Sequence, residues 1–181
     1  MRVIDVDIVI PGMHLPDGLL TVDDVLALPE TDQYRLELHE GAIRVVPPAN
    51  PEHQAVQLEL AIYFRGLGRK VYPNIGIQID EFGYRIPDLA VLRKGRTVTT
   101  AVLQSPDLFD LIVEVVSPGS VDEDRLLKSK VYAQAGIPEY WRVENTAAGR
   151  VVVQSRLQGE RYRQFGEVAL VELLAGGGGL G

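Results

Sequence analysis

The chain has 181 residues, of which 46% are hydrophobic and 24% are charged, as in ordinary soluble globular domains. It contains no cysteine, which excludes disulfides, zinc-thiolate sites and cysteine nucleophiles and agrees with a reducing cytoplasm. The formal net charge of −7 argues against a protein that coats nucleic acid, but it leaves room for an enzyme with a local basic groove.

The length and the hydropathy pattern predict a single domain with its own core. No apolar run approaches the roughly 20 residues that a membrane span needs, and the N-terminus lacks the pattern of a signal peptide. We therefore expect a cytoplasmic protein with no membrane partner. The domain is predicted over residues 1–174, and the glycine-rich segment 175–181 is predicted to be a flexible tail.

The first third of the chain is predicted to hold a short helix and a β-hairpin. Residues 1–16 alternate apolar and acidic side chains and predict a strand or an extended arm. Residues 20–28 are typical of a short helix that Thr21 caps and a proline stops. Residues 34–38 and 42–46 flank a turn with a glycine, which predicts a hairpin.

The middle of the chain is predicted to form a long helix followed by two strands. Residues 52–68 predict a helix with His53 in its first turn, where histidine is either a capping residue or part of a site. The predicted buried face of this helix contains Val56, Leu60, Tyr63, Phe64 and Leu67. Residues 71–80 and 84–92 predict the two strands of a second hairpin.

The last part of the chain is predicted to alternate strand, helix and strand. The apolar run 111–116 predicts a strand that is covered on both faces. Residues 121–135 predict a helix with Ser120 as its N-cap, and residues 139–143 predict a short strand. The terminal strands are predicted at 150–157, 161–165 and 168–173. This order predicts an α/β (α+β) fold: a central mixed β-sheet flanked by helices, with an N-terminal hairpin and C-terminal strands.

Two acidic residues interrupt apolar strands. Glu114 lies inside the run LIVEVV, and Asp88 follows a proline in IPDLAVL. Because a buried carboxylate without a partner is costly, we expect each to meet a cation, a metal or a proton. At about 100° per residue, Lys128 falls on the apolar face of its helix, which favours a contact with Glu114. The alternative is a solvated ion pair between Asp124 and Lys128.

Asp88, Glu114 and Lys128 together predict hydrolysis of a phosphodiester. Carboxylate ligands without cysteine suit Mg²⁺ or Mn²⁺. Such an ion lowers the pKa of bound water and neutralises charge on a phosphate, and a neighbouring lysine can position the water or stabilise the transition state. The P-loop and G-x-S-x-G patterns are absent, and one Trp and four Phe do not supply the aromatic platform expected of a glycosidase.

These motifs resemble a known family. The segments are P-D at 87–88, E-V-V-S-P at 114–118, D-x-x-x-K-x-x-x-Y at 124–132 and A-G-I-P-E-Y-W at 135–141. Their order is similar to that of the Uma-two family, a bacterial group of restriction-endonuclease-like proteins in the PD-(D/E)xK superfamily. The segments Y-R-L-E-L-H-E-G and P-E-H also match, so the resemblance covers roughly residues 21–143.

The resemblance implies a restriction-endonuclease-like core and nucleic acid, DNA first of all, as the substrate. It implies Asp88 and Glu114 as metal ligands. The sequence departs from the superfamily signature where Val116 occupies the E-x-K lysine position. In the family that it resembles, the lysine corresponds to Lys128 on the following helix.

Three further residues carry over from the family as secondary site residues. Glu37 is expected to reach the metal, His53 to lie at the site, and Tyr132 to support the lysine or simply to pack. Homodimerisation is also an expectation from the family.

Three functions remain open from the sequence. The first is a metal-dependent endonuclease. The second is a catalytically inactive, nuclease-like binding module whose carboxylates are paired internally. The third is a metal-dependent phosphatase or another hydrolase on the same scaffold.

Overall fold

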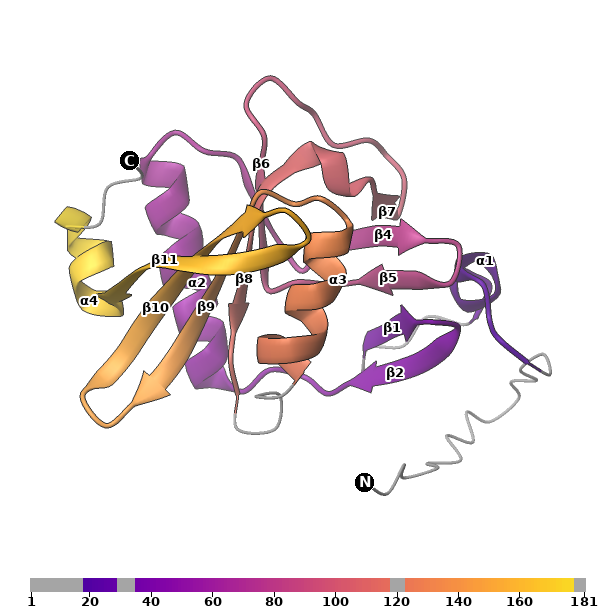
Figure 1. Cartoon of the computed structure of the whole chain (residues 1–181), viewed down its shortest axis with the longest axis horizontal. Helices are drawn as coiled ribbons and strands as arrows, with labels where there is room; N and C mark the ends of the chain where they lie inside the picture. Colours follow the sequence, from indigo (N-terminus) through magenta and orange to yellow (C-terminus); the bar gives the residue numbers. More distant parts are fainter. Residues whose placement is uncertain (1–17, 29–34, 118–122, 178–181) are drawn as a thin grey trace.

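The structure is a computed structural model that describes residues 18–28, 35–117 and 123–177. Within these residues the chain forms two mixed sheets with helices packed against them (Figure 1). The predicted N-terminal arm, the Ser120 cap and the end of the predicted tail lie outside the described residues. None of the described helices is long and apolar enough to cross a membrane.

The larger sheet has six strands. In spatial order they are β11 (Arg161–Ala169), β10 (Gly149–Gln158), β9 (Glu139–Thr146), β8 (Phe109–Val115), β6 (Leu89–Leu92) and β3 (Val71–Pro73). Only β8 and β9 run parallel, and the other neighbours are antiparallel. A parallel pair needs a crossover connection, and here the chain between β8 and β9 supplies it with a helix.

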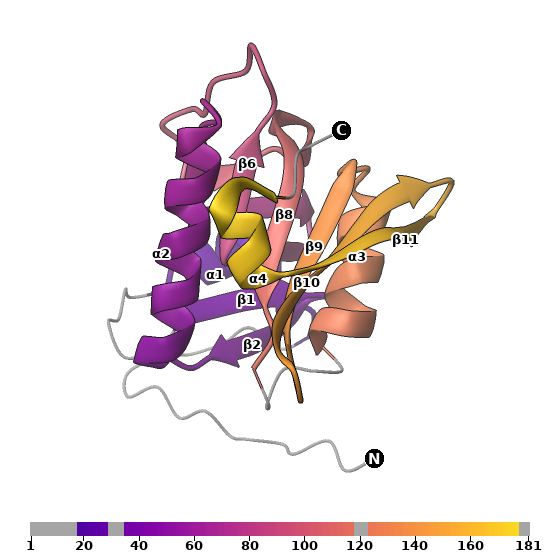
Figure 2. The same ribbon diagram turned by 90° about the vertical axis from the view of Figure 1, so that its left-hand side faces the viewer.

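Helices cover both faces of the larger sheet. Figure 2 shows α2 (Pro51–Gly66) on one side of β8 and β9 and α3 (Lys128–Gln134) on the other side. A wider helical turn at Glu123–Leu127 leads directly into α3. Asn50 caps α2, since its side chain accepts a hydrogen bond from the amide of His53 and Pro51 occupies the first turn.

Residues of β8 alternate between two cores. Val113 and the other odd-numbered residues of the run pack with Val56, Leu60 and Phe64 of α2. Ile112 packs on the opposite face with Tyr132 of α3. Because side chains alternate across a strand, Glu114 shares the α3 face with Ile112, which explains a continuous apolar run with one acid in it.

The smaller sheet lies beside the larger one, toward the right of Figure 1. Its order is β2 (Ala42–Val46), β1 (Arg35–His39), β5 (Gly83–Arg85), β4 (Gly76–Asp80) and β7 (Leu103–Gln104). A 3₁₀ turn at Pro106–Leu108 follows β7. The helix α1 (Val22–Leu26) packs on this sheet, and Thr21 and Asp24 form the predicted N-terminal cap as a reciprocal capping box.

The second predicted hairpin is correct in its pairing but wrong in its continuity. Each predicted strand is split between the two sheets: β3 and β6 pair in the larger sheet, and β4 and β5 pair in the smaller one. One break falls at Asn74, which has a φ of 53°, and the other at Pro87, which has no amide hydrogen to donate. The Asn74 amide donates to the Asp88 carbonyl at 3.2 Å, so the two breaks lie together.

The C-terminus corrects two further expectations. Residues 168–173 are not a separate strand, because β11 continues through a bulge to Ala169 and the chain then turns into the short helix α4 (Leu170–Glu172). Leu170 and Leu173 are both buried, and their spacing of three suits a helix rather than a strand. A helical turn at Leu173–Gly177 follows.

Leu67, predicted on the buried face of α2, is 48% exposed because the helix ends at Gly66.

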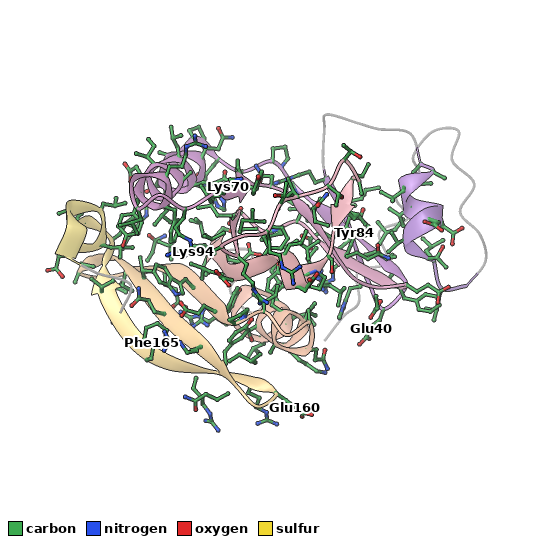
Figure 3. All side chains as sticks on the ribbon, turned by 90° about the horizontal axis from the view of Figure 1, so that it is seen from above. Glu40, Lys70, Tyr84, Lys94, Glu160 and Phe165 are labelled. Atoms are coloured by element: carbon green, nitrogen blue, oxygen red, sulfur yellow. The ribbon has the colours of Figure 1, made fainter. Side chains whose placement is uncertain are left out.

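The strand β11 forms one edge of the larger sheet. Figure 3 shows Phe165 along β11 and Glu160 at the turn before it, on the side of the molecule away from Tyr84 of β5. The residues with predicted catalytic roles lie between these two regions, where β6 and β8 run between α2 and α3.

Candidate active site

Asp88 immediately precedes β6, and Glu114 lies on the neighbouring strand β8. The antiparallel register pairs Leu89 with Val113, and one step further along the same register sets Asp88 across from Glu114. The Asp88 carboxylate accepts a hydrogen bond from the Val115 amide at 2.7 Å, which holds its Oδ2 against β8. The two acids are 7% and 2% exposed, so both carboxylates are largely removed from water.

Lys128 reaches Glu114 from the crossover helix. Its Nζ lies 3.0 Å from Glu114 Oε2, and its side chain is 12% exposed. The hydroxyl of Tyr132 donates to Glu114 Oε1 at 3.0 Å. Lys128 and Tyr132 are four residues apart in a helix and therefore share one face, so α3 contacts both oxygens of this carboxylate.

The Tyr132 hydroxyl is held in its protonated form. Burial raises the pKa of Tyr132 well above its usual value, and the nearby carboxylates of Glu114 and Glu37 raise it further. A neutral phenol can donate a hydrogen bond, whereas a phenolate can only accept one. Tyr132 is thus a fixed donor that orients Glu114.

His53 approaches Asp88 from the first turn of α2. Its Nε2 lies 2.8 Å from Asp88 Oδ1, and the Asn50 cap holds its backbone. Among the residues that the structure describes, no aligned hydrogen bond reaches this buried nitrogen. His53 is therefore both part of the capped turn and a neighbour of Asp88.

Glu37 has contacts that differ from those expected of a metal ligand. Its Oε2 lies 2.9 Å from Nη1 of Arg85, which is fully buried, and its Oε1 accepts a hydrogen bond from the Ile86 amide at 2.8 Å. Both oxygens hold the segment that passes through Pro87 to Asp88. Glu37 also lies near enough to Tyr132 to raise its pKa, and its role as a metal ligand stays a prediction.

Gln57 and Asn74 were not found by the sequence reasoning. Gln57 Nε2 donates to the carbonyl of Asp88 at 2.6 Å and to Asn74 Oδ1 at 3.1 Å. Gln57 is buried at 9% exposure on the face of α2 that also buries Leu60. A polar residue four positions after His53 on an apolar face was the available signal, because buried amides need partners.

The donor set fits a hard divalent cation bound through few protein ligands. Among the described parts of the chain, no three His, Asp or Glu side chains are grouped so that they could hold a metal ion. Mg²⁺, however, is commonly bound through one or two carboxylates, with water and substrate phosphate completing its shell. Asp88 and Glu114 supply two carboxylates, and His53 Nε2 is a buried nitrogen beside the first of them.

The chain has a mixed sheet between two helices, two acids set across from each other in the strand register and a lysine in contact with one of them, which is consistent with a restriction-endonuclease-like fold. Residues 22–178 match the family model described as "Uma2: Putative restriction endonuclease". The chain therefore belongs to the Uma2 family, as the sequence motifs predicted.

A solved structure has the same fold. It is described as the crystal structure, at 1.96 Å resolution, of "a putative nuclease belonging to DUF820" from Anabaena variabilis ATCC 29413. The TM-score is 0.67 at 17% sequence identity, and the alignment covers 86% of this chain and 98% of that chain. The comparison with curated proteins finds no match. The predicted fold class is confirmed, while the roles of individual residues stay predictions.

Proposed function

We propose that this chain is a divalent-metal-dependent endonuclease that hydrolyses phosphodiester bonds in nucleic acid, with DNA as the first substrate to test. The family description and the nuclease-like fold support the reaction class. The observation that carries the proposal is the contact between Lys128 Nζ and Glu114 Oε2 across from Asp88. It brings an amine and two acids from three separate elements together.

Asp88 and Glu114 are the residues that would hold Mg²⁺ or Mn²⁺. When bound, such an ion lowers the pKa of a water molecule and neutralises charge on the phosphate. Val115 and Tyr132 orient the two carboxylates by donating hydrogen bonds to them. In metal sites such supporting hydrogen bonds fix the ligands and tune their affinity.

Lys128 supplies the positive charge for the phosphate. The E-x-K position of the strand is occupied by Val116, which is 8% exposed and carries no amine. The ammonium group of Lys128 instead contacts the Glu114 carboxylate from α3. A preorganised cation at this place stabilises the charge that develops on a transferring phosphoryl group.

A second function has a specific observation in its favour. Each acid of the site has a cationic or imidazole neighbour within the chain: Glu37 has Arg85, Asp88 has His53, and Glu114 has Lys128. Together with the net charge of −7, this supports a nuclease-like module that binds a partner and cleaves nothing. A phosphatase on the same scaffold has no observation of its own.

Calorimetric titration with Mn²⁺ separates the two functions. The endonuclease should show saturable binding that Asp88→Ala abolishes. Asp110→Ala is the matched control, because Asp110 lies on β8 but pairs with Arg69 and Arg93 outside the site. Absence of Mn²⁺ binding in the wild-type protein supports the binding module. Cleavage is then screened on single- and double-stranded DNA and RNA with Mg²⁺ and Mn²⁺.

Homodimer formation and a cytoplasmic location stay proposals. Analytical ultracentrifugation at several protein concentrations tests the dimer directly. A single species at the monomer mass across that range would contradict it.

A further inference from the structure

A cleft lies next to the Asp88 segment, on the side of the smaller sheet. It is a cleft of about 630 Å³ between the β1–β2 hairpin, α2 and the end of β3. Its polar lining comes from Arg35, Gln54, Gln57 and Asn74, and Leu58 and Pro73 are among its apolar residues. Small-molecule sites have this size and this mixture of an apolar lining with a few placed polar groups.

Two residues that line the cleft are hydrogen-bonded to the backbone of Asp88. Gln57, which lines it, donates to the Asp88 carbonyl at 2.6 Å, and the amide of Asn74 donates to the same oxygen at 3.2 Å. A group bound in this cleft would therefore be a near neighbour of a phosphate at Asp88. In a nucleic acid, the group next to a phosphate is a nucleoside.

Hydrogen bonds within the cleft fix the direction of its two amides. Both hydrogens of Gln57 Nε2 are used, one by the Asp88 carbonyl and one by Asn74 Oδ1. Asn74 Oδ1 also accepts from Nη1 of Arg35. Two groups are left over: the acceptor Gln57 Oε1 and the donor Asn74 Nδ2. Among the described residues neither atom has a hydrogen-bond partner, and both residues line the cleft.

The backbone at Asn74 adds a second sign of a built arrangement. Its φ of 53° lies in the left-handed region, which costs energy for most side chains and is tolerated best by glycine and asparagine. Strained positions persist where the surrounding contacts hold them, and they concentrate at ligand sites. With this backbone conformation, Asn74 Oδ1 accepts hydrogen bonds from Gln57 and Arg35.

We propose that this cleft is a nucleobase subsite beside the scissile phosphate, which rests on the proposed nuclease function. Gln57 Oε1 can accept a hydrogen bond from a base and Asn74 Nδ2 can donate one, and every base presents a donor beside an acceptor on its pairing edge. In adenine and cytosine these are the exocyclic amine and a ring nitrogen, and in thymine and guanine they are a ring N–H and a carbonyl oxygen. The subsite thus holds the base next to the cleaved bond without selecting among the four.

The test measures binding of the four deoxynucleoside 5′-monophosphates by NMR saturation transfer, without divalent metal. We expect each of the four to bind about 5- to 100-fold more tightly than 2-deoxyribose 5-phosphate, which carries no base, since this is the usual range for a two-hydrogen-bond base contact. Nucleotide binding no tighter than that of 2-deoxyribose 5-phosphate, or no nucleotide binding at all, overturns the subsite.

A matched pair of variants locates the site. Leu58 lines the cleft and is 61% exposed, whereas Ile62, one turn further along α2, is 62% exposed and does not line it. Leu58→Glu should repel the nucleotide phosphate and weaken nucleotide binding at least about 10-fold, and Ile62→Glu should leave it unchanged. Equal effects of the two variants would overturn the location.

Failure of the subsite and failure of the nuclease give different results. Cleavage of DNA without nucleotide binding would overturn the subsite alone. Nucleotide binding that Leu58→Glu removes, without cleavage of any substrate, would leave the subsite standing and overturn the nuclease.

Discussion

Lys128 Nζ lies 3.0 Å from Glu114 Oε2, and both side chains are largely buried. Such a pair is weak evidence for stability, because desolvation of two charges offsets much of their attraction. The Glu114 carboxylate also receives the Tyr132 hydroxyl. The stability they add is therefore not a sufficient reason for the arrangement, which agrees with the role proposed for the acid and the amine at a substrate.

Replacement of Lys128 should separate catalysis from metal binding. Lys128→Ala removes the charge that would stabilise the phosphate, so cleavage should fall by about 10²–10³-fold. Mn²⁺ binding should remain, because the carboxylate ligands are intact. Cleavage rates and calorimetric titrations on the same preparation provide the measurement. Cleavage at the wild-type rate would contradict the role given to Lys128.

Two further variants show whether a loss of folding explains the effect of Lys128→Ala. Lys130→Ala removes an exposed lysine from the same helix and should leave cleavage unchanged. Lys128→Arg keeps the positive charge and should retain part of the activity that Lys128→Ala loses. Thermal unfolding of each variant reports any loss of the fold directly.

Glu114→Gln should weaken both metal binding and cleavage. The substitution keeps the shape of the side chain but removes the negative charge that would hold the ion and that now meets Lys128. Asp110→Asn on the same strand is the control, since Asp110 pairs with Arg69 and Arg93 instead. A Glu114→Gln variant with wild-type Mn²⁺ affinity would remove Glu114 from the ligand set.

The sequence was sufficient for the centre of the site. Asp88, Glu114 and Lys128 each stand in an apolar context where a charge is costly without a partner, and this contrast can be read without coordinates. Helical periodicity favoured the contact between Lys128 and Glu114 over a solvated pair of Lys128 with Asp124. The apolar patterns also predicted the three elements that position these residues: β6, which Asp88 immediately precedes, β8 and α3.

The surroundings of the site were less visible in the sequence. The split of two long strands between two sheets depends on a left-handed residue at Asn74 opposite a proline break, and neither residue alone indicates a change of sheet. Likewise the buried pair of Glu37 and Arg85 joins positions 48 residues apart. Such a contact is created by strand pairing, and no local sequence pattern predicts it.

The effects of replacing Glu37 and Arg85 on the free energy of unfolding should not be additive, and loss of Glu37 should weaken Mn²⁺ binding. Either single variant, Glu37→Leu or Arg85→Met, leaves a buried charge unpaired and should cost about 3–5 kcal/mol. The double variant should recover much of that stability. Its Mn²⁺ affinity should still fall about 10- to 100-fold, because Glu37 no longer holds the segment before Asp88.

Urea unfolding and Mn²⁺ titration of the three Glu37 and Arg85 variants test both parts of this expectation. If the double variant is no more stable than the less stable single variant, the two side chains do not act as a unit. If its Mn²⁺ affinity equals that of the wild type, Glu37 does not position Asp88.

Tyr132→Phe should leave Glu114 with one hydrogen bond fewer in a buried place. Loss of such a partner costs about 1–3 kcal/mol, and the less constrained carboxylate should also lower the cleavage rate. Because the pKa of Tyr132 is raised well above its usual value by burial, the phenol stays protonated in neutral buffers. The variant should therefore change the cleavage rate by the same factor from pH 6 to pH 9, and a ratio that varies with pH would show that the hydroxyl titrates.

Glu144 gives stability a dependence on pH outside the proposed site. Burial raises the pKa of Glu144, but hydrogen bonds from Arg125 and Arg142 outweigh this and lower the pKa below its usual value. A depressed carboxylate stabilises the fold above its unfolded pKa, about 4.3, and loses this contribution as the pH falls through the folded pKa. The stability advantage of wild type over Glu144→Gln should thus be complete at pH 7, begin to shrink below about pH 4.3, and disappear in stronger acid.

Thermal unfolding at pH 7, 5, 4 and 3 measures this advantage. Arg142→Gln removes one of the donors to Glu144 and should make the stability depend less on pH. Parallel curves for wild type and Glu144→Gln at every pH would show that the two arginines do not hold the carboxylate in its charged form.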